Sequence, residues 1–430
     1  MFLYLSLKEK TEQDVAFTIA GAALRDSHGN WVDVAVSGRV DSGLLGAGQQ
    51  KLAEFLVPEG MYSRLKLVVK DAEVRREGER YSLAVSQPDG VYEQDIDLVV
   101  VRGECQALFA YLAPGQSVVD RYLLVPRISI VNQATEMRNL SLFVTDSASD
   151  AVTVVDRQRM TVVAAFAVGG RPLGLAYAAD DKRLYVACAA SRSIAVVDPS
   201  AGRVTATIGT FGYAPEGVVV TSNGRYLFAT NPAEDSVSVV DLRDNAFQEK
   251  IDVDTGPSDI AYASERNMVY VASRIASSLA VINGATPALE RKVALGFRPD
   301  GIAVHGDSLY VASDATGSIH VLDLPSCVET TVIPLPRPRW VLSGISDRVY
   351  VSSPDDGALR IVHEKTGSAT SVFALAGRPA RMAVDRERRI LYVTTPDSDT
   401  VVAIDLVANT VIDVLHVGRE PFDLTVVDTQ

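Results

Sequence analysis

Short runs of apolar residues recur along most of the chain at a nearly constant interval. Seven of them share the pattern of Leu184-Tyr185-Val186-Ala187, and they occupy residues 142–145, 184–187, 227–230, 269–272, 309–312, 349–352 and 391–394. Their third residues lie at 144, 186, 229, 271, 311, 351 and 393, so the steps are 42, 43, 42, 40, 40 and 42 residues. A period near forty residues built on β-branched and aromatic strands is typical of a β-propeller, in which each repeat forms one blade.

Each repeat contains the signals for four strands. A Gly/Arg-Pro turn opens the first strand, the recurring apolar run forms the second, and the third ends in Asp or a substitute for it. The fourth strand has the weakest pattern. The prolines of the opening turns are Pro172, Pro215, Pro257, Pro299, Pro338, Pro379 and Pro421.

The first repeat lacks a strand that the end of the chain can provide. No opening turn precedes the run at 142–145, whereas the turn at Pro421 begins a last apolar strand with no repeat after it. We therefore expect the C-terminal strand to complete the first blade as its innermost strand. Closure of this kind protects strand edges that would otherwise be exposed. The prediction is a seven-bladed propeller closed three plus one.

The N-terminal part of the chain follows a different pattern. Apolar and polar residues alternate at 15–19, 31–36, 62–69 and 96–101, with Gly- and Pro-containing turns between these segments. Alternation of this kind predicts half-buried antiparallel strands. We expect an immunoglobulin-like β-sandwich at residues 1–125, a linker at 126–140 beginning with Pro126, and the propeller at 141–430. The predicted fold class is all-β.

The repeats resemble those of a known family of propellers. Runs such as Leu184-Tyr185-Val186-Ala187 are similar to the Tyr-Val-Thr-Asn (YVTN) repeats of surface-layer-type seven-bladed propellers, and the run at 227–230 is followed by Asn231. The resemblance covers nearly the whole repeat region and implies a WD40-like ring of blades. The family is functionally mixed, with cell-surface and periplasmic binding modules prominent.

The N-terminal part has a resemblance of its own. Gly60, Tyr62, Leu65 and Leu67 match the Gly-x-Tyr-x-x-Leu-x-Leu strand of a domain of unknown function that is common in bacterial lipoproteins. This likeness implies a bacterial protein located outside the cytoplasm, in the periplasm or on the cell surface, and it carries no activity. No signal peptide or lipid anchor is visible in the chain, since the apolar run at 1–7 is too short for a signal-peptide core.

Charge and composition restrict the function classes. The net charge is −13; residues 1–140 carry 15 Lys/Arg against 19 Asp/Glu, and the remainder carries 26 against 35. Both parts are acidic, which argues against a nucleic-acid binder. No apolar run is long enough for a membrane span, and no Cys-x-x-Cys-His haem site occurs. The five histidines form no closely spaced pair, so we expect no metal site, no cofactor and no catalytic residue.

Arginines are concentrated at the turns that open the innermost strands, and these turns surround one mouth of the central channel of a propeller. They are Arg171, Arg298, Arg337, Arg339, Arg378, Arg381 and Arg419. We expect Arg339, Trp340 and Arg381 to contact a ligand, because they lie just inside the strand starts. The remaining candidate binding residues are Arg171, Arg298, Asp300 and Asp423. Such a mouth could hold an anionic or sugar-acid group through paired hydrogen bonds.

The same arginines have a structural interpretation. They could instead bond to neighbouring blades and to the acids beside the same turns, because structural ion-pair networks imitate binding sites. The acids in question are Glu216, Asp300, Glu420 and Asp423.

The sequence favours a non-enzymatic binding or scaffold protein that presents one propeller face to a protein or glycan partner. The alternative is an enzyme of the propeller lactonase or lyase type, with a metal or the carboxylates of Asp259, Asp300 and Asp423 at the channel mouth. A third interpretation is a structural subunit of a surface array.

Overall fold

The computed structural model describes residues 1–8, 14–36, 38–45, 48–85, 88–133, 139–364 and 366–429. These residues form two compact units, 1–135 with 155–167 and 136–154 with 168–430. Strands dominate the described residues. The helical segments among them are single turns, namely α1 (Ser42–Leu45), α2 (Pro114–Ser117) and the 3₁₀ turns η1 (Pro88–Gly90), η2 (Pro232–Glu234), η3 (Pro354–Asp356) and η4 (Pro396–Ser398).

The N-terminal part is built from two main sheets. One sheet has the order β13 (Ile128–Asn132), β10 (Ala107–Leu112), β1 (Phe2–Leu7) and β5 (Gln49–Glu54). The other has the order β3 (Trp31–Val34), β2 (Asp14–Asp26), β6 (Gly60–Arg76) and β7 (Glu79–Ser82), with β4 (Gly38–Asp41) on β2 and β9 (Val91–Val100) on β6. A small sheet consists of β11 (Val118–Val119), β12 (Leu123–Leu124) and β8 (Ala84–Val85).

The two main sheets share one hydrophobic core. Leu3 of β1 and Leu108 of β10 belong to the same buried cluster as Phe17 of β2 and Leu67 of β6. The alternating segments at 15–19, 31–36, 62–69 and 96–101 fall largely in β2, β3, β6 and β9, as their pattern predicts. The alternation of apolar and polar residues therefore corresponds to a β-sandwich, because every second residue of each strand faces the opposite sheet.

The predicted linker at 126–140 contains strand β13, which pairs antiparallel with β10 between Leu108↔Asn132 and Leu112↔Ile128. Residues 134–138 of that segment lie outside the described residues. The boundaries 1–125, 126–140 and 141–430 stay a prediction.

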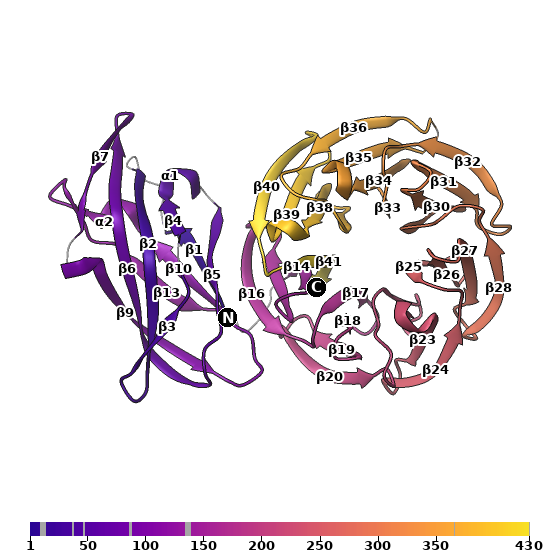
Figure 1. Ribbon diagram of the computed structural model, residues 1–430, viewed down its shortest axis with the longest axis horizontal. Helices are drawn as coiled ribbons and strands as arrows, with labels where there is room; N and C mark the ends of the chain where they lie inside the picture. Colours follow the sequence, from indigo (N-terminus) through magenta and orange to yellow (C-terminus); the bar gives the residue numbers. More distant parts are fainter. Residues whose placement is uncertain are drawn as a thin grey trace. The chain divides into compact units, whose positions relative to one another are not determined.

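The rest of the described chain forms seven four-stranded sheets arranged as a ring (Figure 1). In the order innermost to outermost strand, blades two to four are β17 (Pro172–Ala178), β18 (Arg183–Cys188), β19 (Ser193–Asp198), β20 (Arg203–Gly209); β21 (Val218–Val220), β22 (Tyr226–Asn231), β23 (Ser236–Asp241), β24 (Ala246–Asp252); and β25 (Pro257–Ala263), β26 (Met268–Ser273), β27 (Ser278–Asn283), β28 (Ala288–Ala294).

Blades five to seven follow the same plan. They are β29 (Ile302–His305), β30 (Ser308–Ser313), β31 (Ser318–Asp323), β32 (Glu329–Pro334); β33 (Trp340–Ser343), β34 (Arg348–Ser353), β35 (Ala358–His363), β36 (Ala369–Ala374); and β37 (Met382–Asp385), β38 (Ile390–Thr395), β39 (Thr400–Asp405), β40 (Thr410–His416).

The first blade joins the two ends of the ring. Its sheet has the order β16 (Thr161–Ala167), β15 (Ala151–Asp156), β14 (Asn139–Asp146) and β41 (Pro421–Thr429). β41 pairs antiparallel with β14, with Leu142 opposite Val426 and Val144 opposite Leu424. Figure 1 shows β41 at the inner edge of this blade. The seven-bladed ring and its three-plus-one closure are thus confirmed.

The recurring apolar run packs one blade against the next. Tyr185 of β18 is fully buried and shares a core cluster with Leu227 and Val240 of the following blade. Because this second strand is covered on both faces, its apolar residues are continuous rather than alternating. The described helices include none long and apolar enough to cross a membrane.

Ring closure by β41 predicts the effect of a core substitution in that strand. Leu424 is 4% exposed, and truncation of a buried Leu to Ala typically lowers the free energy of unfolding by about 2–5 kcal/mol. We expect Leu424→Ala to show a loss in this range in chemical denaturation. Val372→Ala is the control, because Val372 is 60% exposed on the outer strand β36. Equal losses for the two variants would contradict closure through β41.

Candidate functional site

The residue two places after each opening proline decides what lines the central channel. These residues are Gly174, Gly217, Asp259, Gly301, Trp340, Arg381 and Asp423. Glycine is required where neighbouring inner strands approach closely. A Cβ atom on Gly174 would lie 2.5 Å from the carbonyl oxygen of Glu216, and one on Gly301 would lie 2.5 Å from that of Arg339. The larger side chains at the other positions therefore occupy the channel.

A cavity of ≈ 280 Å³ follows the channel; we call it the channel cavity. Its polar and aromatic lining consists of Asp259, Tyr262, Trp340, Ser343, Arg381 and Asp423. Four of these residues, Asp259, Trp340, Arg381 and Asp423, are substitutions at the position that is glycine in the other three blades. The repeat thus determines the backbone around the channel, and the four positions at which glycine is replaced provide the charged and aromatic side chains.

An ion pair crosses the channel. Arg381 of blade seven donates from Nη2 to Oδ1 of Asp259 in blade four at 2.8 Å, and their side chains are 18% and 3% exposed. The guanidinium carbon of Arg381 also lies 3.8 Å from the centre of the Trp340 ring, within the range of a cation–π interaction. Arg381 is therefore held by an acid on one side and by an aromatic face from blade six.

The two channel aspartates also connect adjacent blades. The other carboxylate oxygen of Asp259, Oδ2, accepts a hydrogen bond from the backbone N–H of Ile302 in blade five at 2.8 Å. Asp423 of β41 accepts from the N–H of Leu175 in blade two at 3.3 Å. Burial raises the pKa of Asp423, and the charge of Arg381 opposes that rise. Both carboxylates thus connect inner strands as well as facing the cavity.

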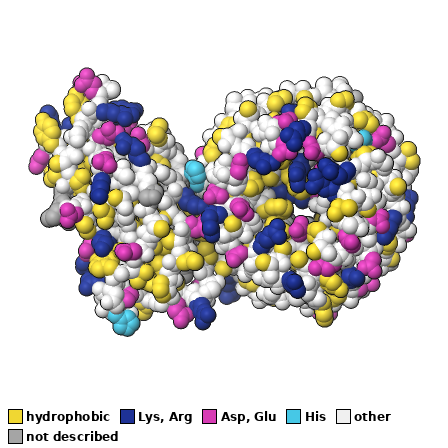
Figure 2. Space-filling model, viewed as in Figure 1, with side chains coloured by type: hydrophobic (Ala, Val, Ile, Leu, Met, Phe, Trp, Pro, Cys, Tyr) yellow, Lys and Arg dark blue, Asp and Glu magenta, His cyan; other side chains and the backbone are white. Residues whose placement is uncertain are grey.

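A second cavity of ≈ 340 Å³ lies at the end of the channel formed by the opening turns; we call it the mouth pocket. It shares Gly217, Trp340 and Arg381 with the channel cavity. Its apolar side is formed by Pro232, Pro257, Ile275, Trp340 and Phe422, and its charged residues are Glu216, Arg274, Asp300, Arg339 and Arg381. Figure 2 shows Lys and Arg side chains gathered beside the centre of the ring on the displayed face of the propeller.

The charged groups of the mouth pocket differ in how well they are paired. Arg274 Nε lies 2.7 Å from Oδ1 of the buried Asp300, although it is not aligned for a hydrogen bond. Arg339 forms no ion pair within the described part of the chain, and its guanidinium carbon lies 5.7 Å from the Trp340 ring centre. Arg381 Nε is buried and has no hydrogen-bond acceptor among the described residues either. The pocket therefore has unused donors beside an aromatic ring.

Glu216 lies near the arginines of the mouth pocket but forms no ion pair with them within the described residues. It is half-buried and lines the mouth pocket. Burial raises its pKa, while the charges of Arg171 and Arg381 oppose the rise. Its ionisation therefore costs the folded protein free energy.

The structure brings together some of the expected residues. Arg339, Trp340, Arg381 and Asp300 line the mouth pocket, and Asp423 lines the channel cavity. Arg171 and Arg298 are exposed and belong to the lining of neither cavity.

The structural interpretation holds for part of the arginine set. Arg337 and Arg378 both form ion pairs with Asp355, which lies in the loop between their turns. Acids of such loops also accept from turn N–H groups, as Asp150 does from Arg171 at 2.7 Å and Asp397 from Arg378 at 2.8 Å. These loop acids are therefore engaged in holding the turns in place.

Arg274 and Phe422 line the mouth pocket but were not among the expected site residues. Arg274 has a signal in the sequence: it directly follows strand β26, at a place that is not basic in the other repeats. The residues there are Ser147, Ala189, Pro232, Asp314, Pro354 and Pro396. Phe422 has no such signal, because its position after Pro421 is occupied by varied residues across the repeats.

The described residues contain no group of three or more His, Cys, Asp or Glu side chains that could hold a metal ion.

The ion pair across the channel predicts a large effect on stability. Removing one partner of a buried pair leaves an uncompensated charge and typically costs about 3–5 kcal/mol. We expect Arg381→Met to lower the free energy of unfolding by about this amount in urea denaturation. The control is Arg378→Met, whose exposed ion pair with Asp355 is worth about 1 kcal/mol or less. Equal losses would show that the pair with Asp259 does not support the ring.

The raised pKa of Glu216 predicts a pH dependence with a definite sign. A folded-state pKa above the ordinary 4.5 means that the folded protein binds the proton more tightly than the unfolded chain. Stability contributed at Glu216 therefore falls as the pH rises from about 4 to about 7. We expect Glu216→Gln to gain stability relative to the parent over this range, measured as the difference in melting temperature.

Asp198 provides the control of opposite sign. Its pKa is lowered by the hydroxyl of Ser200 and nearby backbone N–H groups, so the parent should gain stability relative to Asp198→Asn as the pH rises from about 2 to about 5. A difference between Glu216→Gln and the parent that does not change with pH would contradict the role given to Glu216.

Comparison with solved structures shows the fold of this chain. A functionally unknown protein from Desulfotomaculum acetoxidans is 13% identical with a TM-score of 0.59, over 68% of this chain and 100% of that one. Streptogramin B lyase is 15% identical with a TM-score of 0.52, over 59% and 86%. The WD40 repeats of RRP9 are 12% identical with a TM-score of 0.53, over 66% and 88%.

These similar proteins include an enzyme and a WD40-repeat protein, so at such identities they show a β-propeller and no activity. No protein-family model matches the chain, and no curated protein is significantly similar to it. The resemblance to the YVTN-repeat family and to the lipoprotein-type domain stays a prediction.

Proposed function

We propose that this chain is a non-enzymatic binding module whose mouth pocket receives an acidic side chain of a protein partner together with a neighbouring apolar side chain. The observation that carries the proposal is the environment of Arg339. Its guanidinium has no acid partner among the described residues and lies beside the aromatic ring of Trp340. An arginine placed in this way is suited to a carboxylate brought by a ligand.

The composition of the pocket favours a protein partner over a glycan. Trp340, Phe422 and Ile275 offer aromatic and aliphatic surface next to the charged groups. Interfaces between proteins are commonly anchored by aromatic residues and arginine in a desolvated pocket. A hydroxyl-rich ligand would bring few apolar groups to pack against this surface.

Electrostatics supports the same ligand class. The chain as a whole carries a net charge of −13. Within the described residues, however, Arg171, Arg298 and Arg339 around the mouth form no ion pair, and Arg339 lies in the pocket itself. A local positive region in an acidic protein attracts acidic segments and gives the protein one preferred docking face.

The carboxylates of the channel support binding over the alternative of an enzyme. Asp259 is occupied by Arg381 and by the N–H of Ile302, and Asp423 accepts from Leu175 and Leu424. Groups engaged in this way serve to hold blades together. An enzyme would instead turn over a substrate at the mouth, and this outcome is distinguished by the experiment below.

The location outside the cytoplasm belongs to the proposal as well, and it rests on the resemblance of Gly60, Tyr62, Leu65 and Leu67 to the lipoprotein-type domain. Fractionation of cells that express the full-length gene product tests it directly. Recovery in the cytoplasmic fraction alone would contradict it.

The binding proposal is tested with short peptides that carry Asp or Glu beside Phe or Leu, and with matched peptides in which the acid is Asn or Gln. We expect the acidic peptides to bind in fluorescence anisotropy and the amide peptides to bind more weakly. A hydrogen bond to a charged group contributes about 1.5–3 kcal/mol, so Arg339→Ala should weaken binding by roughly tenfold to a hundredfold. Added salt should also weaken binding, since the pocket is open to solvent.

The matched control is Arg348→Ala. Arg348 is exposed at the beginning of β34, at the end of blade six that is remote from the mouth, because Trp340 pairs with Ser352 and Ser343 with Val349. Equal binding of acidic and amide peptides, or no effect of Arg339→Ala, would rule out the proposal. Chemical conversion of a bound compound would favour the enzyme instead.

A further inference from the structure

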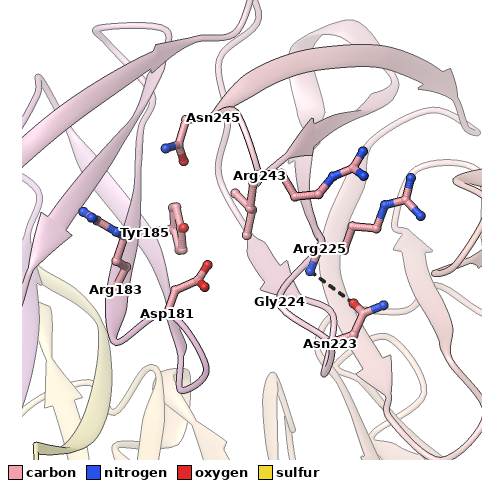
Figure 3. A pocket seen from close by; sticks show the side chains of 9 residues that line it. Asp181, Arg183, Tyr185, Asn223, Gly224, Arg225, Arg243 and Asn245 are labelled. Atoms are coloured by element: carbon pink, nitrogen blue, oxygen red, sulfur yellow. Dashed lines mark hydrogen bonds between the residues drawn. The ribbon is translucent and has the colours of Figure 1, made fainter.

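The seam between blades two and three contains an open cleft at the end of the blades remote from the channel mouth (Figure 3). In blade two, Pro172 pairs with Cys188 at the mouth end and Ala178 with Arg183 at the remote end. The cleft has a volume of ≈ 630 Å³, which is within the range of small-molecule sites. We call it the seam cleft; the residues used below are Asp181, Arg183, Tyr185, Arg225, Arg243 and Asn245.

An equivalent seam elsewhere in the ring is closed by a hydrogen bond. Tyr270 of blade four donates from its hydroxyl to the backbone carbonyl of Leu324 in blade five at 3.2 Å. Tyr185 and Leu242 hold the same places in blades two and three. The hydroxyl of Tyr185, however, has no hydrogen-bond partner among the residues that the structure describes, and Tyr185 and Leu242 both line the seam cleft. The seam between blades four and five is therefore closed by this hydrogen bond, whereas the equivalent seam between blades two and three is open.

Three buried polar atoms of residues that line the seam cleft form no hydrogen bond within the described chain. One of them, Nε of Arg225, lies 4.0 Å from Oδ2 of Asp241, whereas the hydroxyl of Tyr185 and Oδ1 of Asn245 have no such partner. Tyr185 is 0% exposed, and its hydroxyl forms no hydrogen bond within the described chain. Oδ1 of Asn245 is likewise buried and unpartnered. Buried polar groups in folded proteins are almost always satisfied. Two orphan atoms that line one cavity therefore indicate a ligand that would satisfy both.

The chemistry of these atoms defines the ligand. Asn245 Oδ1 can only accept, whereas the phenol of Tyr185 can donate and accept. Burial and the nearby Asp181 raise the pKa of Tyr185 to about 12, so the phenol keeps its proton at neutral pH. A hydroxyl group of a ligand both donates and accepts, so adjacent hydroxyls suit this pair. Figure 3 shows Asp181 and Asn245 on either side of Tyr185.

Three arginines line the rim of the seam cleft. Figure 3 shows Arg183 on one side and Arg225 and Arg243 on the other. Asp241 forms ion pairs with both Arg243 and Arg225, and it accepts hydrogen bonds from Nε and Nη2 of Arg243. Arg183 forms no ion pair within the described part of the chain, and its Nη1 donates to Oγ1 of Thr205 at 3.0 Å. The remaining donors of this guanidinium suit a ligand that carries a carboxylate.

We propose that the seam cleft is a second binding site, and that it takes a small hydroxyl-rich acid of the sugar-acid class. Ligand hydroxyls donate to Asn245 Oδ1 and bond to the hydroxyl of Tyr185, while the carboxylate lies toward the arginines of the rim. The site shares no residue with the mouth pocket and lies at the opposite end of the blades, so it does not depend on the function proposed above.

The test compares Tyr185→Phe with Tyr270→Phe, which remove the same atom from equivalent places in the repeat. Because the hydroxyl of Tyr185 is unpartnered in the free protein, Tyr185→Phe should leave the melting temperature unchanged or raise it, whereas Tyr270→Phe should lower it. Isothermal titration calorimetry with D-glucuronate then measures binding. We expect Tyr185→Phe to weaken binding by roughly threefold to tenfold and Tyr270→Phe to leave it unchanged.

Two further titrations determine the class of the ligand and the site at which it binds. D-glucose should bind more weakly than D-glucuronate, because it lacks the carboxylate, and Arg339→Ala should not affect glucuronate binding. The proposal is overturned if D-glucuronate shows no saturable binding, if Tyr185→Phe binds it as the parent does, or if binding is lost with Arg339→Ala. A melting temperature lowered as much by Tyr185→Phe as by Tyr270→Phe would also overturn it, since the phenol would then be satisfied within the fold.

Discussion

Closure of the ring is the constraint on which the rest of the propeller depends. Seven sheets packed side by side leave two open faces unless the last blade meets the first, and here β41 makes that junction by pairing with β14. The strand does more than seal an edge. It also brings Asp423 to the channel cavity and Phe422 to the mouth pocket. A chain that failed to close would therefore lose its candidate site together with its stability.

The same geometry explains why chemistry is concentrated at one place. Each inner strand presents the residue two places after its opening proline to the channel, and close approach of neighbouring strands restricts that residue to glycine at Gly174 and Gly301. The blades released from this restriction contribute Asp259, Trp340 and Arg381, and Arg381 contacts Asp259 across the channel and Trp340 of the adjacent blade. Arg381 and Asp259 neutralise each other, whereas Arg339 has no acid partner in the described part of the chain. Structural support and binding capacity thus come from neighbouring positions of a single ring.

Much of the fold could be predicted from the sequence because a propeller repeats its instructions. The spacing of the Leu-Tyr-Val runs and the position of Pro421 were sufficient to predict seven blades and their closure. The candidate site was harder to predict. The turn arginines look alike in the sequence and differ only in the side chains that they contact in the fold. Arg337 and Arg378 meet Asp355, whereas Arg339 meets an aromatic ring. The unpartnered hydroxyl of Tyr185 was also invisible, because Tyr185 and Tyr270 occupy equivalent places in the repeat.

Docking of an acidic protein segment at Trp340 can be observed directly, because the chain contains its own reporter of that event. It contains two tryptophans, Trp31 and Trp340, so a Trp31→Phe variant leaves Trp340 as the sole indole. Its ¹H–¹⁵N signal can be followed by NMR during titration with an acidic peptide and with the matched amide peptide. We expect a saturable shift of this signal with the acidic peptide and a much weaker response to the amide peptide. An unchanged indole signal at peptide concentrations that saturate binding would contradict it.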